Sequence, residues 1–231
     1  MIFHYFRSQS RFDLFIANVD CKPPEFYARH VKNLWILTAN DPYAFRRLLT
    51  LCSGVENLVL FHIKRGIRHP FIPFLEHATA GSHLRRLTCS LEDLFQPWSN
   101  DLNFQHACFA NLTHLHLYDE AEKWSNYAGF ENLSSLTHLA LAYCGGPEEL
   151  AIVTSKLPVL EFVAICHYKS GECYNPIIDN GIPIEVYGIK VVRVDGLTQD
   201  DWERGTAGRE DFWDLVEREV ARRRASMVGD R

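Results

Sequence analysis

Three histidines are the residues of this sequence whose spacing suggests chemistry. His114 and His116 lie two residues apart in the segment N-L-T-H-L-H-L at 111–117, and His138 occupies the matching place in S-L-T-H-L-A-L at 135–141. Three imidazoles could bind zinc, but a flat sheet spreads side chains apart and the spacing brings no further Asp, Glu or Cys ligand. We therefore expect these three histidines to form a ladder of polar side chains on an open sheet, with imidazoles that titrate near neutral pH. The alternative is a metal-binding or hydrolytic role of these histidines.

Other patterns that carry catalysis are missing from the sequence. It contains no glycine-rich phosphate loop, no G-x-S-x-G and no H-E-x-x-H. The pair Asp200-Asp201 opens a predicted helix, where acidic residues complement the helix dipole. Cys166 and His167 are adjacent, so a strand directs them to opposite faces and they cannot form a thiolate–imidazole pair. We expect no enzymatic activity, no cofactor and no bound metal.

The histidines belong to a sequence motif, L-x-x-L-x-L, that recurs along the chain. Its seven versions begin at Val31, Val55, Leu84, Leu112, Leu136, Leu160 and Ile189. The intervals run from 24 to 29 residues, which is the period of leucine-rich repeats. The last two apolar residues of each version point to one face of a strand and their neighbours to the other. No single repeat can bury its apolar set alone, so the repeats must stack.

Two segments between the predicted strands have the helical period. The first begins at Asp41-Pro42, continues with Phe45, Leu48, Leu49 and Cys52 on one face, and has Gly54 at the place of a C-terminal cap. The second spans 147–157 and is followed by Pro158. The predicted fold is α/β: a leucine-rich-repeat-like solenoid with a curved parallel sheet of about seven or eight strands and helices on the convex side.

The two ends differ from the repeats at 31–197. Residues 1–30 are expected to form an N-terminal cap segment, with a strand at 14–19 and a short helix opened by Pro23-Pro24. Residues 198–231 are expected to form a C-terminal capping helix and tail. Their helix carries an apolar stripe, Phe212, Val216 and Val220, with acidic residues first and arginines last.

Stacked strands would place their outward residues side by side on one concave face. Aromatic and arginine side chains on such a face are typical of binding hot spots. The expected partner-binding residues are Trp35, Phe61, Arg86, His114, His116, Tyr118, His138 and Tyr143. The alternative is that these are ordinary sheet residues, with Trp35 and Phe61 covered by flanking segments.

Composition excludes several classes of partner. The net charge is -5 with no long basic run, which gives no footprint for nucleic acid. No apolar run approaches the ~20 residues that cross a bilayer, and the first residues do not resemble a signal peptide. We expect an intracellular protein, cytoplasmic or nuclear, that binds neither nucleic acid nor membrane. The seven cysteines lack a C-x-x-C pair and are expected to be reduced.

The sequence resembles fungal, chiefly basidiomycete, F-box proteins with divergent leucine-rich repeats. The resemblance rests on residues 28–34 (A-R-H-V-K-N-L), the two L-T-H-L phrases, and the tail D-W-E-R-G at 201–205 with D-F-W at 211–213. It implies that the repeats select a ubiquitin-ligase substrate, while an F-box docks on the cullin-ligase adaptor subunit. Ser10–Phe15 resembles the stretch that follows an F-box, and what precedes it is too short to be one. The adaptor subunit is therefore an expected partner only if an F-box is present upstream.

Overall fold

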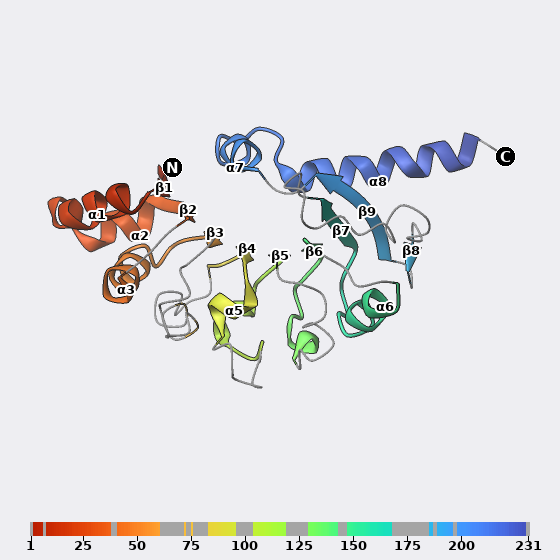
Figure 1. The fold of residues 1–231 in the computed structure, drawn as a ribbon, viewed down its shortest axis with the longest axis horizontal. Coiled ribbons are helices and arrows are strands. Elements are labelled where there is room, and N and C mark those ends of the chain that lie inside the picture. Colours follow the sequence, from red (N-terminus) through yellow and green to blue (C-terminus); the bar gives the residue numbers. More distant parts are fainter. Residues whose placement is uncertain are drawn as a thin grey trace. The chain divides into compact units, whose positions relative to one another are not determined.

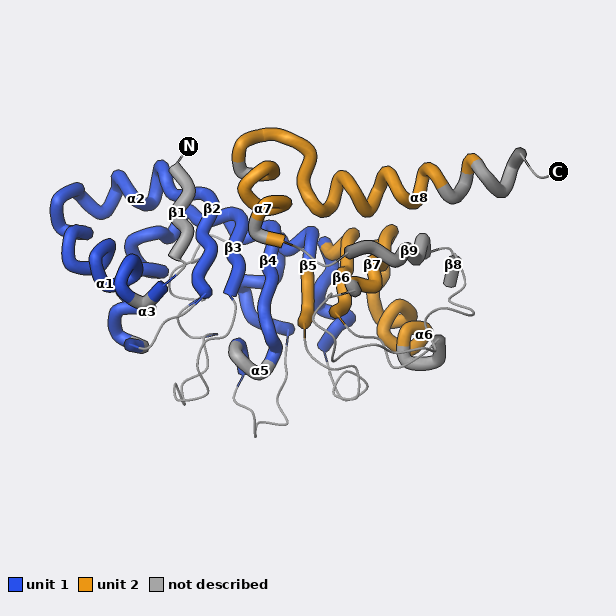
Figure 2. Tube along the Cα trace, turned by 45° about the horizontal axis from the view of Figure 1, so that its top comes forward, with its two compact units in different colours: residues 1–115, 128–135 blue, residues 116–127, 136–231 orange. Residues whose placement is uncertain are grey.

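The computed structural model shows an α/β protein built from parallel strands and helices (Figure 1). It describes residues 2–6, 8–37, 41–60, 72, 75, 83–95, 104–118, 129–142, 147–167, 185–186, 189–195 and 198–229. The chain divides into two compact units, residues 1–115 with 128–135 and residues 116–127 with 136–231 (Figure 2). The boundary falls within one strand, β5 (His114–Leu117), whose first two residues belong to unit 1.

Unit 1 contains parallel strands and the helices that connect them. Its elements are β1 (Ile2–Phe6), α1 (Gln9–Asn18), η1 (Val19–Cys21), α2 (Pro24–His30), β2 (Val31–Ile36), α3 (Pro42–Leu51), β3 (Asn57–Leu60), β4 (Arg86–Cys89), α5 (Leu91–Leu94), η2 (Ala107–Phe109) and η4 (Phe130–Asn132). Strands β1 to β4 pair in chain order, all in parallel. The register places Leu34 beside Leu58 and Leu58 beside Leu87, so equivalent residues of successive repeats are neighbours.

Unit 2 has the same design with a longer helical end. Its elements are β6 (His138–Leu141), α6 (Pro147–Ser155), β7 (Phe162–His167), β8 (Glu185–Val186), β9 (Ile189–Asp195), α7 (Gln199–Thr206) and α8 (Phe212–Gly229). Strands β6, β7 and β9 pair in parallel, and β8 pairs with β9 in the antiparallel sense. Leu139 lies beside Val163, so equivalent residues of these two repeats are also neighbours.

All seven segments with the L-x-x-L-x-L motif form strands, which begin within two residues of the predicted starts. Their inward side chains are buried: Leu34, Leu58 and Leu87 in unit 1 and Leu139, Leu141 and Val163 in unit 2 are at most 2% exposed. Strands β1 and β8 were not predicted. The α/β class with a parallel sheet is confirmed.

Helix α3 confirms the prediction made from its sequence. The Asp41 carboxylate accepts a hydrogen bond of 2.8 Å from the backbone N–H of Tyr43, as an N-cap residue should. Phe45, Leu48 and Leu49 are buried along one face, while Tyr43 on the opposite side is 82% exposed. Helix α6 likewise buries Leu150 and Val153.

The strand predicted at 14–19 is wrong, because this segment lies in α1 and η1. Phe12 and Val19 are buried seven residues apart and Phe15 is half-buried between them, which is the helical period. Leu14 is 65% exposed, so the apolar run does not alternate as a half-buried strand requires. The helix predicted to begin at the prolines is confirmed as α2.

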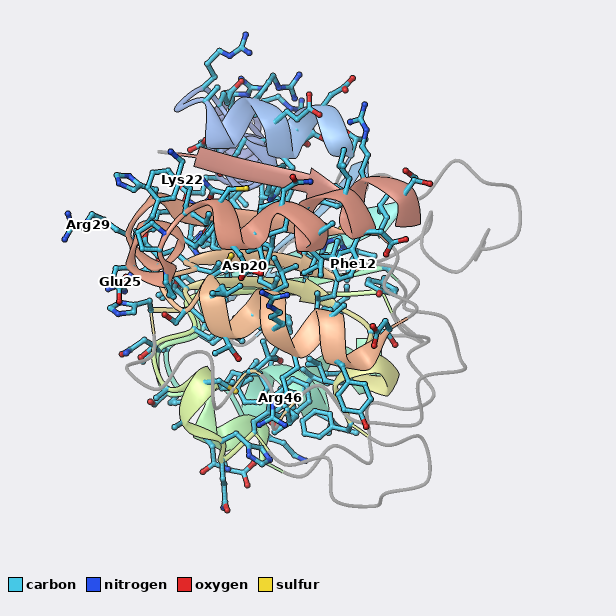
Figure 3. The ribbon with its side chains drawn as sticks, turned by 90° about the vertical axis from the view of Figure 1, so that its left-hand side faces the viewer. Phe12, Asp20, Lys22, Glu25, Arg29 and Arg46 are labelled. Carbon is cyan, nitrogen blue, oxygen red and sulfur yellow. The ribbon has the colours of Figure 1, made fainter. Side chains whose placement is uncertain are left out.

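The exposed surface of α1, α2, α3 and η1 carries both charges (Figure 3). Asp20, Lys22, Glu25 and Arg29 are exposed along η1 and α2. Asp20 forms an ion pair with Arg47 of α3, and the Lys22 ammonium lies 5.7 Å from the ring centre of Phe26. Alternating charges of this kind do not form the basic footprint that binds a phosphate backbone.

Gly54 serves a purpose other than the predicted cap. The C-cap of α3 is Cys52, whose N–H donates to the Leu48 carbonyl, and Gly54 is not among the glycines with positive φ. Instead, a Cβ at position 54 would lie 2.0 Å from the carbonyl oxygen of Ala28 in α2. The Lys32 ammonium also donates to the Gly54 carbonyl at 3.0 Å. A glycine is required here because the backbone at position 54 touches the backbone of α2.

We therefore expect Gly54→Ala to destabilise the protein by about 3 kcal/mol, since the added methyl group meets backbone that cannot rotate away. Urea unfolding followed by circular dichroism measures this change. Gly208→Ala is the matched control: its Cβ would meet nothing within 4 Å, and its φ of +70° costs only about 1 kcal/mol. Equal losses for the two variants would show that the contact with Ala28 is not the reason for the glycine.

Candidate functional site

The outward side of the strands in unit 1 presents its residues in rows. Register places Asn33 beside Asn57 and Asn57 beside Arg86. His114 extends this row, because the backbone N–H groups of Thr113 and His114 both donate to the Arg85 carbonyl, at 2.8 and 3.0 Å. We call Asn33, Asn57, Arg86 and His114 the polar row.

The polar row is held by hydrogen bonds at both of its ends. Asn33 is 1% exposed and its side-chain carbonyl accepts from the Asn57 amide, which fixes the orientation of both side chains. The Thr113 hydroxyl donates to the Arg85 carbonyl at 3.1 Å and lies 2.8 Å from His114 Nδ1. Because the hydroxyl gives its proton to the Arg85 carbonyl, its oxygen is placed to accept from a protonated His114 Nδ1.

Arg86, Asn57 and His114 are half-buried, so the polar row reaches solvent. A guanidinium and an imidazole held side by side are suited to bind a carboxylate, because both donate hydrogen bonds that strengthen with charge. Two predicted binding residues, Arg86 and His114, are therefore brought together by the fold.

A second outward row in unit 1 is buried. It consists of Trp35, Val59 and Thr88, which are 3%, 3% and 6% exposed. The four consecutive residues 33–36 of β2 are all buried, so both faces of this strand are covered. The prediction that Trp35 is an open binding residue has to be corrected. Its burial favours the alternative, a sheet residue covered by other parts of the chain.

In unit 2, helix α8 covers the outward face of β6 and β7. The outward residues Ala140, Phe162, Ala164 and Cys166 form one buried cluster with four side chains of α8, and every member is at most 8% exposed. The α8 members are Phe212, Trp213, Val216 and Val220. The helix predicted to cap the end of the array therefore lies on a sheet face, and its predicted role has to be revised.

His116 and His138 lie within this covered region. The His116 ring is 0% exposed and stacks on Phe212, with ring centres 5.6 Å apart and planes 12° apart. Burial lowers the pKa of the His116 imidazole from 6.5 to about 3, so this ring is neutral at physiological pH. The expectation of a near-neutral titration is thus wrong for His116.

His138 contacts α8 through Trp213 and Glu217, and the strands through Phe162 and Thr137. Its ring stacks on Phe162 at 4.6 Å and meets Trp213 edge-on at 5.7 Å. Its Nε2 lies 3.2 Å from the Glu217 carboxylate, and its Nδ1 lies 2.8 Å from the Thr137 hydroxyl. In both L-T-H-L phrases the threonine hydroxyl thus lies 2.8 Å from Nδ1 of the following histidine, at 113–114 and at 137–138. At the second site the Glu217 carboxylate also contacts the histidine Nε2.

The start of α8 is fixed by its own sequence. Asp211 Oδ1 accepts from the N–H groups of Trp213 and Asp214, at 2.8 and 3.0 Å, and the Asp214 carboxylate accepts from the Asp211 N–H. A Cβ at Gly205 in α7 would lie 2.5 Å from the Asp211 Cβ. The Asp211 cap and the close approach of Gly205 to Asp211 fix where α8 begins, and therefore where Phe212 and Trp213 lie.

The remaining predicted residues are placed as follows. Tyr118 is half-buried directly after β5, whereas Phe61 and Tyr143 lie outside the described residues. Sequence reasoning missed the role of Phe212, Trp213 and Glu217 as contacts of the outward face. The signal was present in F-V-A-I-C at 162–166, since a continuous apolar strand is buried on both faces.

In the described part of the chain, no group of three or more His, Cys, Asp or Glu residues is arranged to hold a metal ion. Nor is any helix of that part long and apolar enough to span a bilayer. His116 and His138 instead stack on different aromatic rings.

Comparison with known proteins gives no functional assignment. No family model matches the sequence. No curated protein matches it either.

Proposed function

We propose that this chain is a non-catalytic protein-binding module, built as a leucine-rich-repeat-like solenoid, whose polar row contacts an acidic segment of its partner. One observation carries the proposal. The strands of successive repeats pair in register, so one polar residue from each repeat stands in line at the same end of β2, β3, β4 and β5. Repeats that stack in this way are used to build extended binding surfaces.

The chemistry of the polar row indicates the kind of partner. Arg86 and His114 supply donors for carboxylates, while Asn33 and Asn57 keep the adjoining strand ends rigid through their hydrogen bond. The equivalent Thr-His pair in unit 2 receives the carboxylate of Glu217, which supports an acidic side chain as the ligand of His114. The resemblance to F-box proteins supports a finer version, in which this partner is a ubiquitin-ligase substrate.

Proximity labelling with the full chain in native cells tests the proposal. Reversing the charge in Arg86→Glu should reduce labelling of the principal partner about tenfold, the effect of losing ~1.4 kcal/mol of binding free energy. Arg85→Glu is the matched control, because it makes the same charge change one residue away, at an exposed position outside the polar row. Equal labelling by wild type and Arg86→Glu, or equal loss in both variants, would contradict the proposal.

A further inference from the structure

The contact between α8 and the strands of unit 2 has the composition of a recognition interface. Two aromatic side chains, Phe212 and Trp213, are buried in it at the start of α8 and meet edge-on with ring centres 4.9 Å apart. At its margin the Glu217 side chain, 54% exposed, reaches His138. Buried aromatic anchors surrounded by polar contacts are the usual arrangement where one protein binds another.

The face under α8 is distinct from the inward core of the same strands. Inward side chains Leu139, Leu141, Val163 and Ile165 are at most 2% exposed and point away from α8, because strand residues alternate. The outward residues Ala140 and Ala164 are small and leave the strands flat beside the stacked rings of His138 and Phe162. A flat apolar strip beside aromatic rings suits an amphipathic helix.

The connection between α7 and α8 is exposed to solvent. Residues 207–210 between α7 and α8 are all exposed, and a Cβ at Gly208 would meet nothing within 4 Å. Residues 212–222 of the helix are amphipathic: Val216 and Val220 are buried, while Glu217, Ala221 and Arg222 are exposed. Among the described residues, α8 is held by the side chains that it buries on the strands, by the cap at Asp211 and by the ion pair between Arg218 and Glu210.

We infer that the outward face of β6 and β7 is a helix-binding site, that α8 occupies it within the chain, and that an amphipathic helix of a partner protein displaces α8. The partner helix carries the pattern of α8: two aromatic residues, valine or a similar residue three and seven positions after the second, and an acid that meets His138. This site does not depend on the polar row, whose residues belong to unit 1.

Cleavage and exchange in the full chain test the inference. A protease-recognition sequence is inserted into the exposed turn 207–210, the purified protein is cut, and a fluorescein-labelled peptide with the sequence of residues 210–226 is added. Fluorescence anisotropy should show saturable binding to the cut protein. The uncut protein should bind at least about 100-fold more weakly, because its tethered α8 competes at millimolar effective concentration.

Two competitor peptides form a matched pair. Val220→Glu places a charge on the buried side of the helix, and Ala221→Glu places the same charge on the exposed side. The Ala221→Glu peptide should displace the label like the natural sequence, and the Val220→Glu peptide should need at least about tenfold more, or ~1.4 kcal/mol. Equal competition by the two peptides overturns the inference. So does an absence of exchange, or loss of the strand signal in circular dichroism when α8 departs, since α8 would then be a permanent part of the core.

Discussion

Replacing Phe212 by alanine is expected to lower the free energy of unfolding by about 3 to 5 kcal/mol, which is the range for removing a buried phenylalanine. Phe212 is 2% exposed and contacts the His116 ring on one side and Trp213 on the other. The truncation removes both ring contacts and leaves a cavity in the cluster between α8 and the strands. Urea unfolding at neutral pH, followed by circular dichroism, measures the loss.

Leu14→Ala is the control for this variant. It also truncates a large apolar residue in a helix, but Leu14 is 65% exposed, so the expected change is within about 0.5 kcal/mol. A loss below about 1 kcal/mol for Phe212→Ala would mean that α8 does not pack on the strands as described.

Acid is expected to destabilise the protein through His116. Because burial lowers the folded-state pKa of His116 to about 3, against 6.5 for the exposed imidazole, the unfolded chain binds more protons between these pH values. The stabilisation from neutral His116 is therefore complete above pH 6.5 and is lost as the pH falls towards 3. The slope approaches about 1.4 kcal/mol per pH unit below pH 6, which amounts to about 2 kcal/mol between pH 6.5 and 4.5.

The measurement compares unfolding free energies of wild type and His116→Leu over this pH range. Other groups titrate in both proteins, so the difference between the two curves isolates the imidazole. Val220→Ala is the control, because it weakens the same cluster but keeps His116. Parallel curves for wild type and His116→Leu would show that His116 is hydrated in the folded protein.

The strands and the first helix were predictable from sequence because they depend on local rules. In the L-x-x-L-x-L motif, apolar residues alternate with a period of two, and the motif recurs every 24 to 29 residues. Each of its seven versions forms a strand. Asp41-Pro42 begins α3 by the same capping chemistry that governs isolated helices. For such segments, the pattern of apolar residues and the cap are enough to predict whether a strand or a helix forms.

The site was less predictable because it depends on contacts between distant segments. Alternation correctly assigned His116 and His138 to the outward face, but it could not show that α8, more than 70 residues later, would cover them. Trp35 was misjudged for a related reason, since hydrophobicity alone does not distinguish a binding residue from a buried one. Arg86 and His114 reach solvent as expected, and their role in binding stays a prediction.

The apolar strand β7 is synthesised before the helix that covers its outward face. A ribosome completes Phe162–Cys166 before it makes α8, and the roughly 45 residues between them take about 2 to 9 s to translate. Throughout that interval the outward residues Phe162, Ala164 and Cys166 lack the cover that α8 gives them in the folded protein. Such a surface pairs readily with other chains, so the yield of native protein depends on how quickly the α8 segment leaves the ribosome.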